Sequence, residues 1–200
     1  MPLLLIDNYD SFTFNVVHLL RDCGEHDVVV VRNDELDVHE LGRYSAVVAS
    51  PGPGLPEESG DLLAAVRFCL EHDVPYLGIC LGHQALGEAC GAQLTQLSRV
   101  RHGVQHTCTV SEPHELLEGV PMEFEVGLYH SWVVDDDDMP PSFAPLAYTS
   151  YGTIQAAHVP GKRAYGLQFH PESIMSPDVG PRIMRNFLDL ARTSTPTARA

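Results

Sequence analysis

The cysteine at position 80 is the residue whose surroundings point most directly to chemistry. Its segment, Gly-Ile-Cys-Leu-Gly over 78–82, follows an apolar run expected to form a strand and precedes a run with helical spacing. A nucleophile elbow has this arrangement, with the side chain on a strained strand-to-helix turn and flanking glycines that let the backbones pass closely. The helix N-terminus favours the thiolate of Cys80, and the amide of Leu81 is placed to donate to an oxyanion. The pattern predicts a cysteine nucleophile.

His170 is the histidine best placed to accept the proton of such a thiol. The apolar run over 164–169 predicts a strand that ends in His170, and Pro171 and Glu172 follow it. Proline holds the residue before it extended, and residues two apart in an extended chain point the same way, so His170 and Glu172 are expected to share a face. A histidine that takes the thiol proton and a carboxylate that orients the histidine complete a catalytic triad. A His-Pro turn with a surface glutamate is the alternative.

Glycines and prolines follow the predicted strand that ends at Ala49, in the sequence Ser-Pro-Gly-Pro-Gly over 50–54. Ligands of open parallel sheets bind outside the carboxyl ends of the strands. Pro53 has no N–H, so only the amides of Gly52 and Gly54 could join that of Leu81 in stabilising an oxyanion. A plain rigid turn remains an alternative interpretation of this segment taken alone.

Three other chemistries are disfavoured. The first predicted strand is followed by the acidic segment Asp7–Asp10, which would repel phosphate, and not by a glycine-rich loop. His102, His106 and Cys108 have the side chains of zinc ligands, but no second cluster completes a closed set, so no metal site is expected. The aspartates over 135–138 lack the spaced ligands of a calcium loop and are expected to lie in a solvated loop.

The elements that must position these residues follow from the spacing of apolar side chains. In the first half, strands are expected over 3–6, 28–31, 46–49 and 76–79, and helices after an N-cap at Ser11, over 62–70 and after Cys80. In the second half, strands are expected over 105–110, 123–129, 144–148, 153–159 and 164–169, before a final helix over 183–191. This order predicts an α/β fold, with a mostly parallel central sheet flanked by helices and an antiparallel extension in the second half. Residues 1–192 are expected to form one domain, and 193–200 a disordered tail.

Composition and charge bear on partners and compartment. Twelve basic and 27 acidic residues give a formal net charge of −15, which would repel a nucleic-acid backbone and favours docking on a basic protein surface. No apolar run approaches the roughly 20 residues of a membrane helix, and the N-terminus lacks the basic start of a signal peptide. Five cysteines without a C-x-x-C pair argue against a disulfide framework, and three of them fall on apolar helix faces as expected core thiols: Cys23, Cys69 and Cys90. These features favour a cytoplasmic protein without a membrane or nucleic-acid partner.

Taken together, the motifs resemble those of the class I glutamine amidotransferases, and among them the glutaminase subunits of anthranilate synthase and aminodeoxychorismate synthase. The resemblance covers residues 3–192. It rests on five segments: Asp-Asn-Tyr-Asp-Ser-Phe-Thr over 7–13, Ser-Pro-Gly-Pro-Gly over 50–54, Gly-Ile-Cys-Leu-Gly-His-Gln over 78–84, Tyr-His-Ser over 129–131, and Gln-Phe-His-Pro-Glu-Ser over 168–173. The segment over 7–13 is the one that narrows the resemblance from the whole class to the anthranilate synthase and aminodeoxychorismate synthase subunits.

The resemblance implies roles for individual residues. Cys80 is the expected nucleophile, His170 the base and Glu172 the carboxylate that orients it. The glutamine pocket is expected to be lined by Gly52, Pro53, Gly54, Leu81, Gln84, Ser131 and Trp132. Two positions depart from the family pattern, Leu128 in place of a basic residue and Trp132 in place of a frequent leucine, and both are expected near the pocket rim or the partner surface.

The resemblance also implies an activity and a partner. L-glutamine is expected to be hydrolysed through a cysteinyl thioester, with the ammonia passed to a separate chorismate-binding synthase subunit. No cofactor is expected in this chain, and Mg²⁺ is expected only in the synthase subunit. The product, anthranilate or 4-amino-4-deoxychorismate or both, stays open. Two rivals remain: a stand-alone cysteine hydrolase of γ-glutamyl bonds, and a non-catalytic regulatory subunit, against which the intact Cys80, His170 and Glu172 count.

Overall fold

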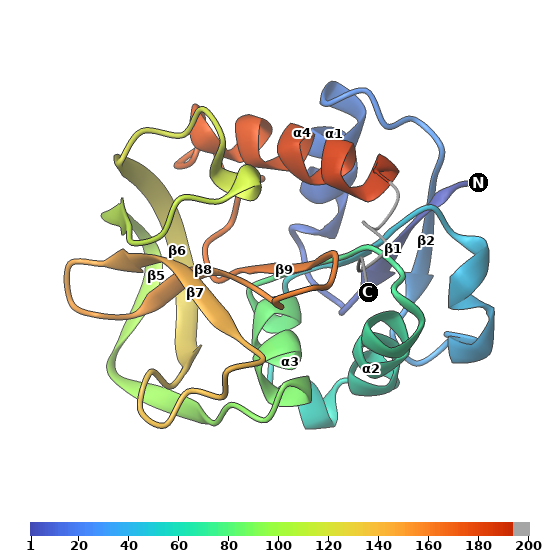
Figure 1. Ribbon diagram of the computed structural model, residues 1–200, viewed down its shortest axis with the longest axis horizontal. Helices are drawn as coiled ribbons and strands as arrows, with labels where there is room; N and C mark the ends of the chain where they lie inside the picture. The colour runs from blue at the N-terminus through green and yellow to red at the C-terminus, as the bar shows by residue number, and fades with distance from the viewer. Residues whose placement is uncertain (194–200) are drawn as a thin grey trace, which may run out of the picture.

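The computed structural model describes residues 1–193, in which nine strands form one sheet with helices on both of its faces (Figure 1). The strands are β1 (Leu3–Asp7), β2 (Val28–Arg32), β3 (Val47–Ala49), β4 (Tyr76–Ile79), β5 (Leu94–Val110), β6 (Glu123–Val134), β7 (Ala144–Thr149), β8 (Ile154–His158) and β9 (Ala164–Leu167). The α-helices are α1 (Thr13–Asp22), α2 (Leu62–His72), α3 (Leu81–Ala89) and α4 (Val179–Arg192). Three short 3-10 helices are η1 (Val38–Arg43), η2 (Pro56–Glu58) and η3 (Glu115–Leu117).

The first five strands in spatial order, β2-β1-β3-β4-β9, pair in parallel throughout. Every residue of β3, β4 and β9 is buried, which explains why these strands appear in the sequence as short apolar runs without alternation. The edge strand β2 is partly exposed instead. The parallel half is therefore the part of the sheet that apolar runs alone predict best.

The other strands extend this sheet in the order β9-β8-β7-β5-β6, and all of their pairings are antiparallel. The mixed sheet, parallel in one half and extended by antiparallel strands in the other, confirms the predicted α/β class. β5 and β6 are far longer than predicted, at 17 and 12 residues. The first part of β5 carries mostly exposed side chains and has no apolar alternation, so pairing with β6 and not its own sequence keeps it extended.

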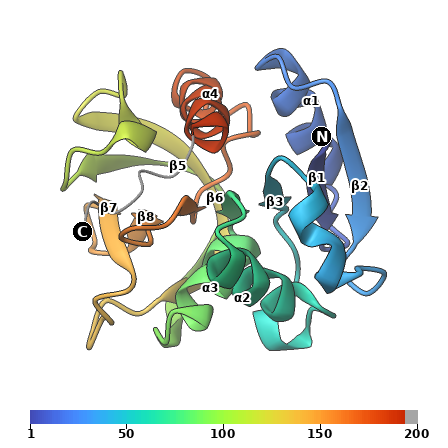
Figure 2. The same ribbon diagram turned by 45° about the vertical axis from the view of Figure 1, so that its right-hand side comes forward.

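The helices divide the core between the two faces of the sheet. Figure 2 shows α1 and α4 together on one side, and α2 and α3 together on the other. The α1–α4 face buries Leu20 and Phe187 among others, and the α2–α3 face buries Val66 and Leu86. No helix in the described part of the chain is long and apolar enough to cross a bilayer.

Two predicted boundaries next to the candidate site are wrong. Ser11 is not the N-cap of α1, which begins at Thr13 without a side-chain cap; the carboxylate of Asp10 accepts from the N–H of Phe12, and that of Asp7 accepts from the Thr13 hydroxyl. Neither carboxylate accepts from a backbone N–H within α1; the two fix the start of the helix through the Phe12 amide and the Thr13 hydroxyl instead. β9 ends at Leu167, short of the predicted end at Phe169. Of the tail predicted over 193–200, residues 194–200 lie outside the described residues.

Candidate active site

The carboxyl ends of three neighbouring parallel strands meet at one edge of the sheet. β3 leads into the segment 50–54, β4 into Cys80, and β9 into the segment that contains His170. Because β3, β4 and β9 are adjacent and run in the same direction, these three segments must lie side by side. The three motifs singled out in the sequence thus belong to one place in the fold.

Cys80 lies between β4 and α3 in a backbone conformation that L-residues rarely adopt, with φ 52° and ψ −100°. Its amide donates to the carbonyl of Leu167 at 2.7 Å, and its carbonyl accepts from the amide of Gln84 at 3.0 Å. A Cβ atom on Gly78 would lie 2.2 Å from the carbonyl carbon and oxygen of Gly82, so no side chain fits at position 78. The strained strand-to-helix turn predicted from the sequence is confirmed.

The side chains of His170 and Glu172 are both buried and directly joined. The ring nitrogen Nδ1 of His170 lies 2.6 Å from Oε1 of Glu172. The other ring nitrogen, Nε2, is buried and has no hydrogen-bond partner within the described chain. Aromatic rings flank the imidazole, with Tyr129 at 4.8 Å and Phe12 at 5.4 Å between ring centroids. One nitrogen is therefore fixed by a carboxylate while the other is left available on the side of Cys80.

The backbone that joins His170 to Glu172 is a turn and not the extended chain expected from the proline. The amide of Ser173 donates to the carbonyl of His170 at 3.2 Å, so Pro171 and Glu172 are the central residues of this turn. The turn brings the two side chains together, and burial of the Glu172 side chain removes the alternative of a surface glutamate. The predicted contact between His170 and Glu172 is therefore present, but a turn and not an extended backbone produces it.

Strand β6 holds this turn in place. The amide of His170 donates to the carbonyl of Gly127 at 3.1 Å, and the amide of Gly127 donates to Oγ of Ser176 at 2.9 Å. The hydroxyls of Tyr129 and Ser173 lie 3.0 Å apart, within hydrogen-bond distance. These bonds fix the position of the imidazole relative to the wall that β6 supplies.

Opposing effects set the protonation of His170. Burial lowers the pKa of the imidazole, but interactions with the Cys80 thiol and the Glu172 carboxylate outweigh it and raise the pKa to about 10. Opposite charges within reach favour the charged form of each partner. These interactions therefore favour the protonated form of His170, the form that a base must adopt when it accepts a proton.

The segment 50–54 is held from the far side by Asn8, which follows β1. The amide of Asn8 donates to Oγ of Ser50 at 3.0 Å, and its side-chain Nδ2 donates to the carbonyl of Ser50 at 2.7 Å. A Cβ on Gly52 would lie 2.6 Å from both Asn8 Cβ and Leu81 Cδ2, so the close packing here requires glycine. The first sequence motif thus has a structural function: it positions the glycine-rich segment.

A cavity of about 220 Å³ opens onto Cys80. Its walls include all but one of the residues predicted to bind glutamine: Gly52, Pro53, Gly54, Gln84, Ser131 and Trp132. The exception is Leu81, whose side chain packs in the core with the α2–α3 cluster. Only the backbone amide of Leu81 remains as a possible contribution, as the elbow pattern predicts. The roles of these residues in binding stay predictions.

Comparison with known proteins agrees with this geometry. The model of the family described as glutamine amidotransferase class-I matches residues 4–191. The chain belongs to this family.

Individual relatives cover nearly the whole chain. A putative anthranilate synthase component II of Haemophilus influenzae is 39% identical over 197 residues, which is 98% of this chain and 100% of the relative. An aminodeoxychorismate/anthranilate synthase component 2 of Bacillus subtilis is 35% identical over 196 residues, covering 95% of this chain and 97% of the relative. The crystal structure of a putative GMP synthase subunit from Thermoplasma acidophilum matches with a TM-score of 0.83 and 27% identity, over 96% of this chain and 94% of that one.

Two residues of this amidotransferase chain line the cavity although they were not predicted to bind substrate, Tyr129 and His130. Burial, reinforced by nearby His170, lowers the pKa of His130 to about 4. Burial also lowers the pKa of the adjacent His83, on α3, to about 3. Both histidines belong to motifs quoted from the sequence, but a motif does not tell which of its side chains face the cavity.

Leu128 is not at the pocket rim or on an exposed surface, contrary to expectation. It is fully buried in the core on β6, because inward-facing residues alternate with those that face the other way along the strand. Trp132 does lie at the rim. It borders both the cavity at Cys80 and a second cavity, of about 360 Å³.

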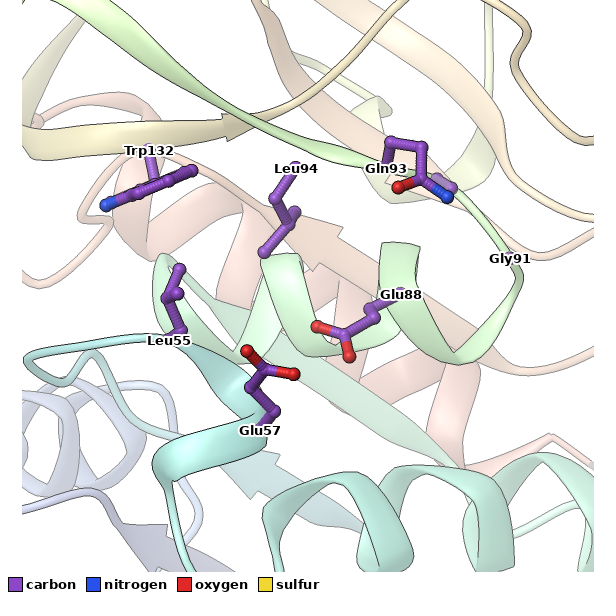
Figure 3. Close-up of a pocket in the computed structure, with 8 residues that line it drawn as sticks. Leu55, Glu57, Glu88, Gly91, Gln93, Leu94 and Trp132 are labelled. Carbon is purple, nitrogen blue, oxygen red and sulfur yellow. The ribbon is translucent and has the colours of Figure 1, made fainter.

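Figure 3 shows the second cavity of this amidotransferase. Trp132, Leu55 and Leu94 form one side of it, and the carboxylates of Glu57 and Glu88 point toward one another on the other side. Burial raises the pKa of Glu88, and the negative charge of Glu57 adds to this. The rim of the active-site cavity is thus acidic beyond Trp132. No group of three or more potential metal ligands occurs within the described residues.

Proposed function

We propose that this class I amidotransferase hydrolyses L-glutamine and delivers the ammonia to a chorismate-using synthase subunit. The observation that carries the proposal is that Cys80, on its strained elbow at a small cavity, interacts with His170, whose other side is held by the buried carboxylate of Glu172.

The geometry supports a thioester mechanism. His170 takes the thiol proton, and Sγ of Cys80 attacks the side-chain amide carbon of glutamine. The negative charge on the amide oxygen is stabilised by the backbone amides of Leu81 and of Gly52 or Gly54. His170 then returns the proton to the departing nitrogen, which leaves as ammonia, and a γ-glutamyl thioester remains on Cys80. Water activated by His170 attacks the thioester, releasing glutamate and restoring the thiol.

The proposed synthase partner is supported by the names of two relatives, anthranilate synthase component II and aminodeoxychorismate/anthranilate synthase component 2. The acceptor of ammonia is then a chorismate-binding synthase subunit. Either anthranilate or 4-amino-4-deoxychorismate is compatible with these names. No cofactor is assigned to this chain, and Mg²⁺ belongs to the synthase subunit.

The test is steady-state release of glutamate from glutamine by the chain alone, with the synthase subunit, and with that subunit plus chorismate. We expect Cys80→Ser to abolish glutamine-dependent synthesis and to leave synthesis from added ammonium chloride intact, because only the thiol step is lost. Glutaminase activity that ignores the synthase subunit would favour a stand-alone hydrolase. An inactive wild-type chain that still binds the synthase would favour a regulatory role.

A further inference from the structure

Two buried amide side chains connect the wall of the cavity with the Cys80 sulfur. Nε2 of Gln84 donates to the carbonyl of Trp132 at 2.8 Å and to Oε1 of Gln168 at 3.2 Å. Nε2 of Gln168 donates to Sγ of Cys80 at 3.6 Å. The Gln168 side chain is completely shielded from solvent, with 0% of the residue exposed.

The orientation of both amides is fixed by the first bond of the chain. A backbone carbonyl can only accept, so Gln84 must present its NH₂ group to Trp132. That same NH₂ group faces Gln168, which must therefore present its oxygen to Gln84. The remaining NH₂ group of Gln168 is then directed to the sulfur of Cys80. A flipped Gln168 would place two NH₂ groups against each other and leave the sulfur facing an oxygen.

We propose that Gln168 is a catalytic residue of the glutaminase, a donor that stabilises the Cys80 thiolate and is held in place by Gln84. The inference rests on the proposed function for its role in turnover, but the contact with the sulfur does not depend on it.

A donor of this kind has a specific use at this site. A thiol sulfur is a weak acceptor and a thiolate a much stronger one, so the N–H of Gln168 favours the charged form. His170 gives up its proton to ammonia during the reaction, whereas an amide does not titrate and keeps its N–H throughout. Gln168 therefore also stabilises the thiolate when Cys80 leaves the thioester. The carbonyl of Trp132, on the rim of the substrate cavity, sets the alignment of this donor through Gln84.

The test is the alkylation of Cys80 by iodoacetamide as a function of pH, followed by peptide mapping of the full chain. The titratable side chains around the sulfur are His170 and Glu172 in the turn after β9, and Tyr129 and His130 on β6; all are kept in the variants. In Gln168→Leu we expect the pH of half-maximal alkylation to rise by about one unit, the shift expected for loss of one hydrogen bond to a charged group. Below that pH, alkylation slows about tenfold.

Gln155→Leu is the matched control. Gln155 is also fully buried, on the neighbouring strand β8, and its carbonyl accepts from the amide of Gln168 at 2.9 Å. Its side chain donates to Oγ1 of Thr153 at 3.2 Å and not to Cys80. The control variant therefore loses a buried amide of the same kind without losing the donor to the sulfur, and its alkylation profile should match that of the wild type.

Several outcomes decide the inference. Equal midpoints in wild type, Gln168→Leu and Gln155→Leu would overturn it, and so would the same rise in both variants. Gln168→Asn, whose shorter side chain cannot reach Sγ, replaces Gln168→Leu if the latter does not fold, and should show the same rise. Because alkylation needs no glutamine, the midpoint rises even if the chain proves not to be a glutaminase. If it is one, kcat falls in Gln168→Leu while KM for glutamine changes little, since Gln168 does not line the cavity.

Discussion

At the scale of single residues, the turn at Cys80 depends on the glycines around it. A Cβ at position 78 would lie 2.2 Å from the carbonyl group of Gly82, which is helix backbone and cannot move aside. We expect Gly78→Ala to lower the free energy of unfolding by at least about 3 kcal/mol, the upper range for overpacking a close-packed site. Gly42→Ala is the control, because nothing lies within 4 Å of the added Cβ there. Urea unfolding followed by circular dichroism measures both, and equal stabilities would contradict the elbow packing.

Buried histidines make a second prediction at this scale. Burial lowers the pKa of His83 from 6.5 to about 3 in the folded state. Below pH 6.5 the unfolded chain binds a proton at His83 that the folded chain does not bind. The contribution of His83 to the free energy of unfolding is therefore fully present above pH 6.5 and is lost as the pH falls toward 3. His83→Gln should flatten the decline of unfolding free energy in this window by up to about 1.4 kcal/mol per pH unit. The exposed His18→Gln serves as the control, and an unchanged slope in His83→Gln would contradict the effect of burial.

The pair His170–Glu172 yields a third prediction. Replacing Glu172 by Gln keeps the size of the side chain but removes the charge that lies 2.6 Å from Nδ1 of His170. The pKa of His170 should fall, because an opposite charge that raises it is lost. We expect kcat for glutamine to drop by about 10⁴, the loss typical of removing the orienting carboxylate of a triad, with KM little changed.

Glutamate release by Glu172→Gln and by Glu123→Gln, which changes an exposed carboxylate on β6, separates this effect from a general loss of charge. A wild-type kcat in Glu172→Gln would mean that the carboxylate does not orient the base.

At the scale of elements, the sequence predicts strands and helices well where the apolar pattern comes from burial on both faces. β1, β3 and β4 are such strands, and the turn at Cys80 follows from the glycines around it. The apolar pattern does not predict secondary structure where tertiary contacts determine the conformation of the chain. The first part of β5 is exposed, and it is extended because β6 pairs with it. The apolar run predicts that His170 ends a strand, whereas it lies in a turn, where its amide bonds to Gly127 on β6. Sequence spacing cannot reveal such a contact, since the two segments are about 40 positions apart.

The candidate site shows the same division. The three expected catalytic residues, Cys80, His170 and Glu172, can be recognised in the sequence because a reactive or charged side chain directly after an apolar strand is unusual. The contact of Gln168 with Cys80 and that of Asn8 with Ser50 do not, since buried amides carry no periodic signal and their partners are remote in sequence. Both residues lie in segments singled out in the sequence, but their contacts with Ser50 and Cys80 could be found only once the fold had brought β1, β3, β4 and β9 together.

The contact between the segment after β1 and the glycine-rich segment leads to a prediction at the element scale. Asn8→Ala removes the side-chain bond to the carbonyl of Ser50 and should let the segment 50–54 move away from Cys80. Misplacing one oxyanion donor costs about 10²–10³ in rate, so a fall in kcat of this order is expected. Asn33→Ala is the matched control, because the side chain of Asn33 donates to Oδ1 of Asn8, at 3.1 Å, and makes neither of the two bonds to Ser50. Similar kcat values in the two variants would contradict the positioning by Asn8.

At the scale of the whole molecule, the surface combines strong negative charge with exposed apolar side chains. Ile174, two residues beyond Glu172 in the segment that contains His170, is 90% exposed, and Phe14, on α1, is 63% exposed. A surface of this kind suits a protein partner that covers the site, and burying these side chains would favour association by removing apolar area from water. The net charge of −15 adds long-range attraction to any basic surface on that partner.

This attraction leads to the last prediction, on association with the synthase subunit. Complementary charge raises association rates by about 10–10³ and is screened as salt shortens the Debye length from about 10 Å at 0.1 M to about 3 Å at 1 M. The association rate constant of the two subunits should therefore fall at least about tenfold over this range, whereas the dissociation rate, governed by buried apolar contacts, should change much less. Stopped-flow mixing of the labelled chain with the synthase subunit measures both constants. Ile174→Ser is the control that separates charge attraction from apolar contact. It should speed dissociation and leave the salt dependence of association intact. An association rate that does not respond to salt would mean that the acidic surface faces away from the partner and that apolar contacts alone drive the association.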